Sequence, residues 1–473
     1  MTNTVHPFNT DTDVISEGNK AHSTLLNHTK PQPIAIEGSG LYFMLEDGRK
    51  ILDAISGGAA VNCLGNGNKE LTEVFVNQIN KMAFSYHQSL GNEAAEGLAN
   101  YLVEKSDEDF KSAVFLNSGS EAVEAAIKLA REYWVKMGQP QRTQIISRFP
   151  SYHGTTLGAL GVGNIPSRRD VSEPLLAKNV YHVTSPQYKR QSYVNKTEEE
   201  YSLRLSHELE EKILEIGSEN IIGFIAEPVV GAALGVMPPP KGYFPLIKKL
   251  LNKYGLLLIF DEVMSGSGRS GGDGLFAYKN KQISEDLDLV KPDILTMAKG
   301  LGSGYVCISS VLSNEKITNK IRESGGWKNS HTYQNHPVNC AVARKVLEIF
   351  ERDNLITSVN ERGEQLISEL KEATRDIETI FDVRGRGLFV GVELIGSSTL
   401  TPRLAARVKD KAFENGLLIM AISGTIDGVE GESVILAPAY TVTKEQISEI
   451  VRLLAKSIKE VIIELDCKAD QQI

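Results

Sequence analysis

Residues 256–263 read LLLIFDEV, and residues 293–304 read DILTMAKGLGSG. Each stretch contains a short apolar run that leads into a charged residue, Asp261 in the first and Lys299 in the second. Continuous apolar runs of this length are typical of strands that are buried on both faces of a parallel sheet. The two stretches therefore predict two buried strands, each with one charged side chain at its carboxyl end.

The rest of the chain extends this pattern, because strand and helix patterns alternate from about residue 67 onward. The clearest further strands are at 113–116, 145–147 and 222–226, and the clearest helices are at 93–105, 121–136 and 206–216. Alternation of this kind is typical of parallel sheets built from βαβ units. The predicted fold class is α/β, with a large domain whose mainly parallel sheet is flanked by helices, and a smaller α+β domain.

A lysine and an aspartate at strand ends suit the cofactor pyridoxal 5'-phosphate (PLP). This cofactor needs an amine for a Schiff base with its aldehyde, and a carboxylate that keeps its pyridine nitrogen protonated. Lys299 and Asp261 are the candidates for these two catalytic groups. Either residue alone could be an ordinary surface charge, so the prediction depends on further residues that suit the phosphate and the ring.

The phosphate has a candidate site where residues 117–120, NSGS, lead from a strand into the helix at 121–136. Free backbone N–H groups and the positive end of the helix dipole attract anions at such a point. Ser118, Gly119 and Ser120 are the candidate ligands. The alternative is that a serine there only caps the helix.

Three more candidate residues also follow predicted strands. Tyr152 could stack on a pyridine ring, and His153 is its polar neighbour. Glu227 could orient the ring substituents or Asp261. The alternative is that Tyr152 is a wall residue and His153 a hydrogen-bonded polar group. All of these residues lie at the carboxyl ends of strands, where open α/β sheets bind ligands.

The composition excludes several classes of function. With 51 Lys and Arg against 60 Asp and Glu, the net charge is −9, which argues against binding to nucleic acid or to an anionic membrane. The nine histidines show no metal-ligand spacing, so no metal site is predicted. Four scattered cysteines fit a reducing compartment. No apolar run is long enough for a membrane span, and the first nineteen residues lack Lys and Arg, so we expect a cytoplasmic protein, with an organelle as the alternative.

Three segments are predicted along the chain. Residues 1–66 should pack with the small domain, residues 67–329 should form the large PLP-binding domain, and residues 330–473 should form the small domain. A hairpin is expected around the turn Asp47-Gly48, and a long surface excursion is expected at 166–200. The last helix should begin with a capping box at 443–446.

At this point the chain resembles a known family, the class III (omega) aminotransferases, which are PLP-dependent enzymes of fold type I. The resemblance covers nearly the whole chain, from Gly40 to the last helix. It is carried by NSGSEA at 117–122, YHG at 152–154, AEP at 226–228, IFDEV at 259–263, AKG at 298–300, HTY at 331–333 and VRGRGL at 383–388.

The resemblance implies a role for each matching residue. Lys299 should bind the cofactor covalently and then move a proton between the substrate carbon and the cofactor. Asp261 should pair with the ring nitrogen, and Val263 and Tyr152 should pack on the two faces of the ring. Thr332 should reach the phosphate of the other subunit, which implies a homodimer with shared active sites.

The implied reaction is the transfer of an amino group in a ping-pong cycle. The donor would be a primary amine, an omega-amino acid or alanine, and the acceptor a keto acid or an aldehyde. The alternative is a PLP-dependent aminomutase or decarboxylating enzyme on the same scaffold.

Two departures from the family pattern bear on the substrate. Members that use glutamate place an acid five residues after the Glu of the Glu-Pro pair, and this chain has Ala232 there. The mobile arginine that this acid restrains is also missing, since no Arg occurs between residues 408 and 450. We therefore expect poor use of glutamate, unless Arg269, Arg384 or Arg386 replaces the missing arginine.

Overall fold

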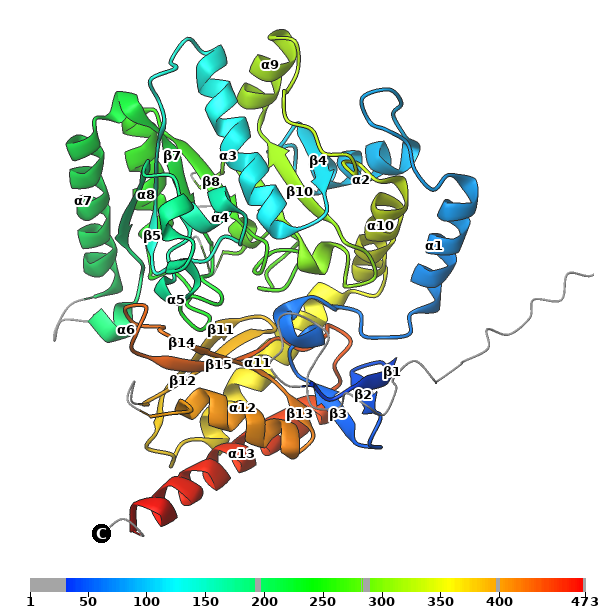
Figure 1. The fold of residues 1–473 in the computed structure, drawn as a ribbon, viewed down its shortest axis with the longest axis vertical. Helices are drawn as coiled ribbons and strands as arrows, with labels where there is room; N and C mark the ends of the chain where they lie inside the picture. Colours follow the sequence, from blue (N-terminus) through cyan, green and yellow to red (C-terminus); the bar gives the residue numbers. More distant parts are fainter. Residues whose placement is uncertain (1–30, 192–196, 282, 284–289, 397–399, 471–473) are drawn as a thin grey trace, which may run out of the picture.

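The computed structural model describes residues 31–191, 197–281, 283, 290–396 and 400–470. Figure 1 shows a large sheet with helices on both sides in the upper part of the molecule, and a second sheet with helices packed on it in the lower part. In the part of the chain that the structure describes, no helix is both long and apolar enough to cross a bilayer.

The large sheet has seven strands, and six of them run in the same direction, as predicted. Only β10 is antiparallel to its neighbours. In spatial order the strands are β4 (Ser112–Leu116), β10 (Ser309–Ser313), β9 (Ile294–Met297), β8 (Leu257–Asp261), β7 (Ile221–Ala226), β5 (Gln144–Phe149) and β6 (Val180–Thr184).

The apolar run of β8 is explained by burial on both faces of this sheet. Leu257 and Ile259 face a core that α3 (Gly119–Lys136) covers, whereas Leu258 and Phe260 face the larger core on the other side. A strand in this position has no polar face, so its sequence does not alternate.

Helices of the large part cover the sheet and its rim. They are α1 (Lys69–Lys81), α2 (Glu93–Lys105), α4 (Leu157–Val162), α5 (Pro166–Arg169), α6 (Tyr188–Gln191), α7 (Glu198–Ile216), α8 (Tyr243–Tyr254) and α9 (Glu315–Glu323). Single turns lie at η2 (Ser56–Ala60), η3 (Glu173–Leu175), η4 (Ser218–Asn220), η5 (Ala277–Lys279) and η6 (Lys299–Leu301).

The prediction of a surface excursion at 166–200 was wrong in two respects. The segment contains β6, an edge strand of the large sheet, whose mixed sequence VYHVT hid it because only Val183 is fully buried. The acidic residues 198–200 begin α7 eight residues earlier than expected, with a capping box between Thr197 and Glu200. Acidic side chains in the first turn of a helix are favoured by its dipole.

The C-terminal part is an antiparallel sheet with helices on one side. Its strand order is β11 (Ile380–Arg386), β12 (Phe389–Leu394), β15 (Glu432–Leu436) and β14 (Met420–Ser423). Its helices are α11 (Leu355–Ala373), α12 (Leu404–Glu414) and α13 (Lys444–Asp470). The predicted capping box is present, because the Thr443 hydroxyl accepts from the backbone N–H of Gln446 and the Gln446 side chain accepts from that of Thr443.

The predicted hairpin around Asp47-Gly48 is also present, between β2 (Tyr42–Leu45) and β3 (Lys50–Asp53). With β1 (Ala35–Ser39) it forms a small sheet that β13 (Leu417–Leu418) completes, so this N-terminal sheet is joined to the C-terminal part. The boundaries at 66 and 329 stay predictions. Helix α10 (Pro337–Arg352) begins beyond the second boundary, yet it packs on α1 and α2 of the large part.

Arg269 joins all three parts of the molecule. Its side chain is 1% exposed and leaves the loop after β8. One guanidinium nitrogen donates to the carbonyl oxygens of Leu388 (3.1 Å) and Pro438 (2.5 Å) in the C-terminal part. The other donates to Ser56 Oγ (3.1 Å) and Cys63 Sγ (3.3 Å) in the N-terminal segment.

Replacing Arg269 by Met should therefore destabilise the fold. The substitution leaves two buried carbonyl oxygens without a donor, at a cost of about 1–3 kcal/mol for each. We expect the free energy of unfolding of the cofactor-free protein, measured by urea denaturation, to fall by about 3 kcal/mol. The urea midpoint should fall with it. Arg322→Met, at an exposed position on α9, is the control and should stay within about 0.5 kcal/mol of the wild type. Equal midpoints for the two variants would contradict this role of Arg269.

Candidate active site

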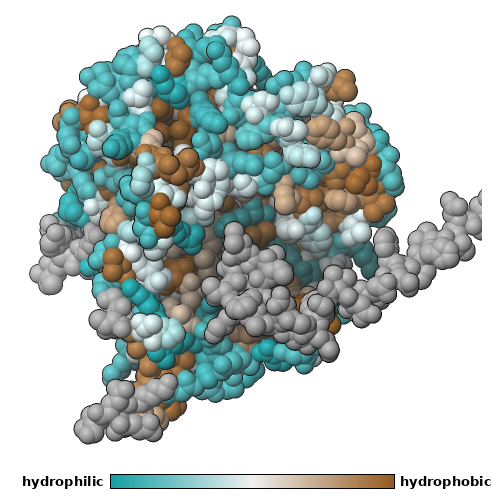
Figure 2. Space-filling model, viewed as in Figure 1, coloured by the Kyte–Doolittle hydropathy of each residue, from teal (hydrophilic) through white to brown (hydrophobic). Residues whose placement is uncertain are grey.

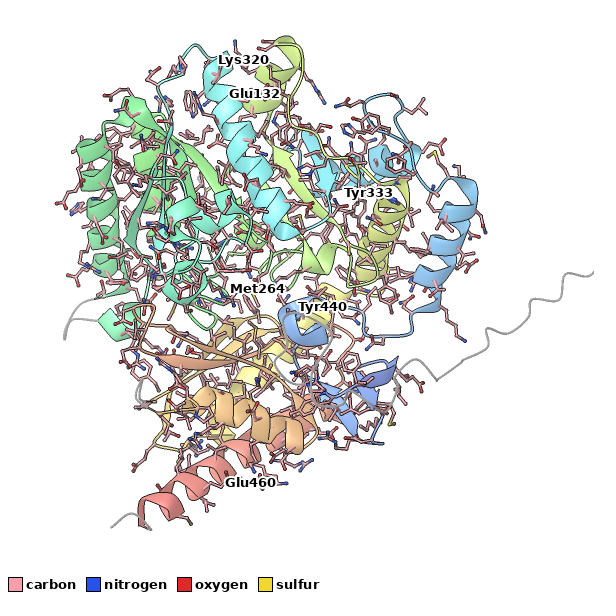
Figure 3. The ribbon with its side chains drawn as sticks, in the orientation of Figure 1. Glu132, Met264, Lys320, Tyr333, Tyr440 and Glu460 are labelled. Atoms are coloured by element: carbon pink, nitrogen blue, oxygen red, sulfur yellow. The ribbon has the colours of Figure 1, made fainter. Side chains whose placement is uncertain are left out.

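A cavity of about 610 Å³ opens at the carboxyl ends of β5, β7, β8 and β9. Its wall brings together nine of the ten predicted site residues: Ser118, Gly119, Ser120, Tyr152, His153, Glu227, Asp261, Val263 and Lys299. The C-terminal part closes one side of the cavity through Met420 on β14, and Met264 lies where the two parts meet (Figure 3).

Lys299 reaches this cavity from the turn that follows β9. Its backbone has a φ of 49°, in the left-handed region that costs energy for any residue with a Cβ. Burial lowers the pKa of the Lys299 amine to about 8, although Asp261 and Glu227 act in the opposite direction. About a tenth of the amine is therefore uncharged, and nucleophilic, at pH 7.

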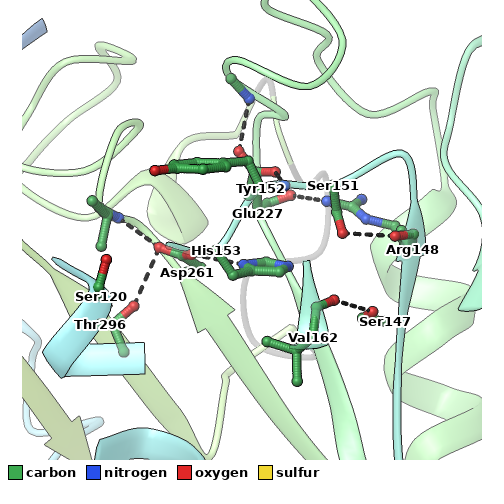
Figure 4. Close-up of polar contacts among 12 residues, drawn as sticks. Ser120, Ser147, Arg148, Ser151, Tyr152, His153, Val162, Glu227, Asp261 and Thr296 are labelled. Carbon is green, nitrogen blue, oxygen red and sulfur yellow. Dashed lines mark hydrogen bonds and ion pairs between the residues drawn. The ribbon is translucent and has the colours of Figure 1, made fainter. Parts of the chain in front are cut away.

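Asp261, the last residue of β8, is held in one orientation by three contacts. His153 Nδ1 lies 2.7 Å from Asp261 Oδ2, and the other carboxylate oxygen accepts from the backbone N–H of Val263 at 3.0 Å and from Thr296 Oγ1 at 3.3 Å (Figure 4). Both His153 and Asp261 are almost completely buried. A buried carboxylate needs such partners, because leaving a charge without them is costly.

Glu227 lies in the same cavity wall and accepts hydrogen bonds from backbone N–H groups. Its carboxylate accepts from the N–H of Tyr152 at 3.2 Å and of Gly231 at 2.8 Å. Burial raises the pKa of Glu227, and the nearby charge of Asp261 raises it further, whereas His153 lowers it. Glu227 thus fixes the loop that carries Tyr152 to the loop after β7.

The N-terminus of α3 forms another part of the wall. The Ser118 hydroxyl caps the helix by accepting from the N–H of Glu121 at 3.3 Å, so the predicted alternative of a serine cap is also true. The Ser120 hydroxyl accepts from the N–H of Thr155 at 3.0 Å. The cap and an anion site are compatible, because capping uses only one of the free N–H groups.

Two glycines are required where these elements meet. A Cβ on Gly119 would lie 2.7 Å from Val263 Cγ1, and a Cβ on Gly154 would lie 2.6 Å from Ser120 Oγ. Gly154 also has a φ of 132°. The close approach keeps the start of α3, the loop after β5 and the loop after β8 around one small space.

Thr332 is the predicted residue that the cavity does not include. It lies exposed in the turn before α10, next to the exposed ring of Tyr333. Its position leaves the predicted role in a second subunit open.

Sequence reasoning missed several wall residues, among them Arg168, Met264, Cys307 and Met420. Thr296, which contacts Asp261, was quoted only as part of its strand. None of them belongs to a motif at a strand end with recognisable chemistry. Arg168, Cys307 and Met420 also come from segments that lie far apart along the chain. The one sequence signal that could have pointed to them is the pair of adjacent positive charges Arg168-Arg169.

The three arginines proposed as replacements for the missing clamp do not line the cavity. The guanidinium of Arg269 donates to the carbonyl oxygens of Leu388 and Pro438. Arg384 donates to the carbonyl oxygens of Val236 (3.0 Å) and Leu234 (2.7 Å) and pairs with Glu393. Arg386 donates to the carbonyl oxygen of Gly385 at 2.9 Å, and burial lowers its pKa.

The chain matches known proteins over most of its length. The family model of class III aminotransferases matches residues 26–458. An aminotransferase of Schizosaccharomyces pombe is 38% identical over 472 residues, covering 98% of this chain and 100% of the relative. The putrescine–pyruvate aminotransferase of Pseudomonas aeruginosa is 29% identical and covers 90% of both chains.

The fold has a solved counterpart as well. The structure of a transaminase with L-alanine superimposes with a TM-score of 0.83 at 32% identity, over 91% of this chain and 100% of that chain. Sequence, fold and site geometry agree, and the resemblance seen in the motifs is confirmed. The chain belongs to the class III aminotransferases, a family of PLP-dependent enzymes of fold type I.

Proposed function

We propose that this chain binds PLP in the cavity described above and transfers an amino group from a primary amine, an omega-amino acid or alanine to a keto acid or an aldehyde. The observation that carries the proposal is the meeting of the Lys299 amine with the Asp261–His153 pair in one cavity at the sheet edge. The ping-pong cycle would use the same cavity for donor and acceptor in turn.

The residues present fit the three chemical parts of PLP. Ser118, Gly119 and Ser120 at the positive end of α3 suit the phosphate. Asp261 suits the protonated ring nitrogen, and the uncharged fraction of Lys299 suits the aldehyde. Gly119 and Gly154 allow the segments that carry these residues to pack closely around the cavity.

When bound, PLP supplies an electron-withdrawing ring that stabilises negative charge on the substrate carbon. Asp261 would pair with the protonated ring nitrogen, and His153 would hold the Asp261 carboxylate in its orientation. Lys299 Nζ, once free, would take the proton from the substrate carbon and return it one position away, as a base with a pKa near the working pH does best. Tyr152 and Val263 would cover the two faces of the ring.

We also propose that the protein is a homodimer in which Thr332 of each chain reaches the phosphate site of the other. An exposed apolar surface supports this proposal, because large apolar patches on a soluble protein mark contact sites. It comprises Phe75, Val76 and Ile79 of α1, Phe84, Tyr86 and Leu90 of the following segment, and Tyr333 beside Thr332. Figure 2 shows apolar surface on the side of the molecule where α1 lies. A cytoplasmic location remains part of the proposal.

The substrate proposal rests on the wall of the cavity. Ala232 stands where glutamate-using members have an acid, and the three candidate arginines lie elsewhere. A second substrate carboxylate would then enter without a dedicated cation. We therefore propose that alanine or pyruvate serves better than glutamate or 2-oxoglutarate, in the way that the name of the P. aeruginosa relative pairs an amine with pyruvate.

Lys299 should be the residue that holds PLP covalently. After incubation with PLP and reduction with borohydride, the wild-type chain should gain the mass of one pyridoxyl phosphate group, and Lys299→Ala should gain none. Lys371→Ala, at an exposed position on α11, is the matched control and should behave as the wild type does. Retention of the added mass by Lys299→Ala would show that another amine binds the aldehyde.

The rate of this capture should depend on pH through the pKa of Lys299. Burial lowers the pKa of this amine to about 8, so the uncharged form is the minor species below pH 8 and the major species above it. The capture rate should rise about tenfold per pH unit below 8 and level off above it. A free lysine derivative, with a pKa of about 10.4, is the control, and its rate should still be rising at pH 9. Identical profiles for protein and derivative would contradict the lowered pKa.

The donor test separates the reaction classes. The PLP-loaded protein, mixed with alanine and no acceptor, should release about one pyruvate per active site and then stop, as a ping-pong transaminase does. Glutamate should release 2-oxoglutarate much more slowly under the same conditions. Fast release from glutamate would contradict the substrate proposal. Release of carbon dioxide, or isomerisation of an amino acid with no keto acid formed, would favour the decarboxylating enzyme or the aminomutase.

A further inference from the structure

Arg168 is an arginine of the cavity wall that the proposed chemistry does not use. It belongs to the short helix α5 and lines the same cavity as Lys299. Its guanidinium carbon lies 4.7 Å from the centre of the Tyr152 ring, a cation–π contact. Among the described residues, the Arg168 side chain has no hydrogen bond or ion pair with a carboxylate.

The neighbouring Arg169 shows the contrast. Its guanidinium pairs with Glu173 at 2.9 Å and donates to the carbonyl oxygen of Gly163 at 2.7 Å. Arg169 therefore anchors α5, whereas Arg168, one residue earlier, points its charge toward the cavity. The segment at Gly428 also packs so closely on α5 that a Cβ on Gly428 would lie 2.6 Å from the ring of Pro166. The contacts of Arg169 and of Pro166 therefore hold α5, and with it the backbone of Arg168, in place.

Of the described charged side chains that line the cavity, Arg168 is the one that can bind an anionic group of the substrate. Asp261 and Glu227 are engaged by His153 and by backbone N–H groups. Lys299 is the reacting amine. The charge of Arg168 is one of the causes that lower the pKa of Lys299, so the two cations act on each other across the same space. A carboxylate on the substrate would be attracted by the charge of Arg168 in this space.

We propose that Arg168 binds the carboxylate of an amino-acid donor and of the keto-acid acceptor. This inference rests on the proposed transaminase function. It assigns to α5 the task of substrate recognition. The other wall residues near the C-terminal part, Met264 and Met420, are apolar and suit an uncharged side chain of the substrate.

The test compares two donors of the same shape. Alanine and isopropylamine differ only in that a carboxylate is replaced by a methyl group. The concentration of donor that gives half the maximal single-turnover rate is measured for each with the PLP-loaded wild type and with Arg168→Gln. For alanine it should rise about tenfold, as expected for one charge-assisted hydrogen-bonded contact at a partly solvated position. For isopropylamine it should not change.

Binding without reaction provides a second readout. Propionate, which has the carboxylate and no amino group, should bind the wild type in calorimetry about tenfold more tightly than it binds Arg168→Gln. Propionamide, its uncharged analogue, should not distinguish the two proteins. Arg322→Gln removes the same charge from an exposed position on α9 and should match the wild type in every assay.

Each result decides a different question. If the wild type forms neither pyruvate from alanine nor acetone from isopropylamine, the proposed function fails. If the wild type is active and Arg168→Gln affects alanine and isopropylamine equally, or affects neither, the role of Arg168 is refuted. Arg168 is exposed, so the substitution should fold. PLP content and thermal midpoint check this, and Arg168→Met, which keeps the stem over Tyr152, repeats the test.

Discussion

The pairing of β8 with β9 is the constraint on which the site depends. The two strands are parallel, with Asp261 opposite Thr296, and the N–H of Glu262 donates to the Thr296 carbonyl oxygen at 2.9 Å. This register brings Asp261 and Lys299 to the same edge of the sheet. A slip of one residue would turn Asp261 to the other face, away from His153 and the cavity. The burial of β8 on both faces opposes such a slip, because alternate residues pack into different cores.

Around this pair, the protein holds buried polar groups at fixed positions. Asp261 and Glu227 each accept backbone or side-chain donors before any ligand enters, so little reorganisation is needed when charge develops. The same burial lowers the pKa of Lys299 and makes a normally charged side chain a usable nucleophile and base. The left-handed backbone of Lys299 is a strained conformation that its tightly packed turn maintains.

Arginines at different positions in this fold have different roles: two of them stabilise the fold, and Arg168 would recognise the substrate. Arg269 is buried and Arg384 is partly buried, and their terminal guanidinium nitrogens are bound by carbonyl oxygens and, for Arg384, by Glu393, so they join segments that are distant along the chain. Arg168 is exposed to the cavity and stacks on Tyr152. A guanidinium without a carboxylate partner can bind an incoming anion, whereas one that is already saturated would have to break buried hydrogen bonds first.

The sequence by itself determined the fold class, the buried parallel strands and nine of the residues that meet in the cavity, because apolar runs and strand-end motifs are local signals. It missed β6 and β10, since an edge strand and an antiparallel strand with serines lack a continuous apolar run. The contact of Asp261 with His153, the hydrogen bonds of Arg269 and the place of Arg168 in the cavity wall were decided only by the tertiary structure. These contacts join residues more than a hundred positions apart, or depend on which way a side chain turns from a short helix, and neither property is encoded in local spacing.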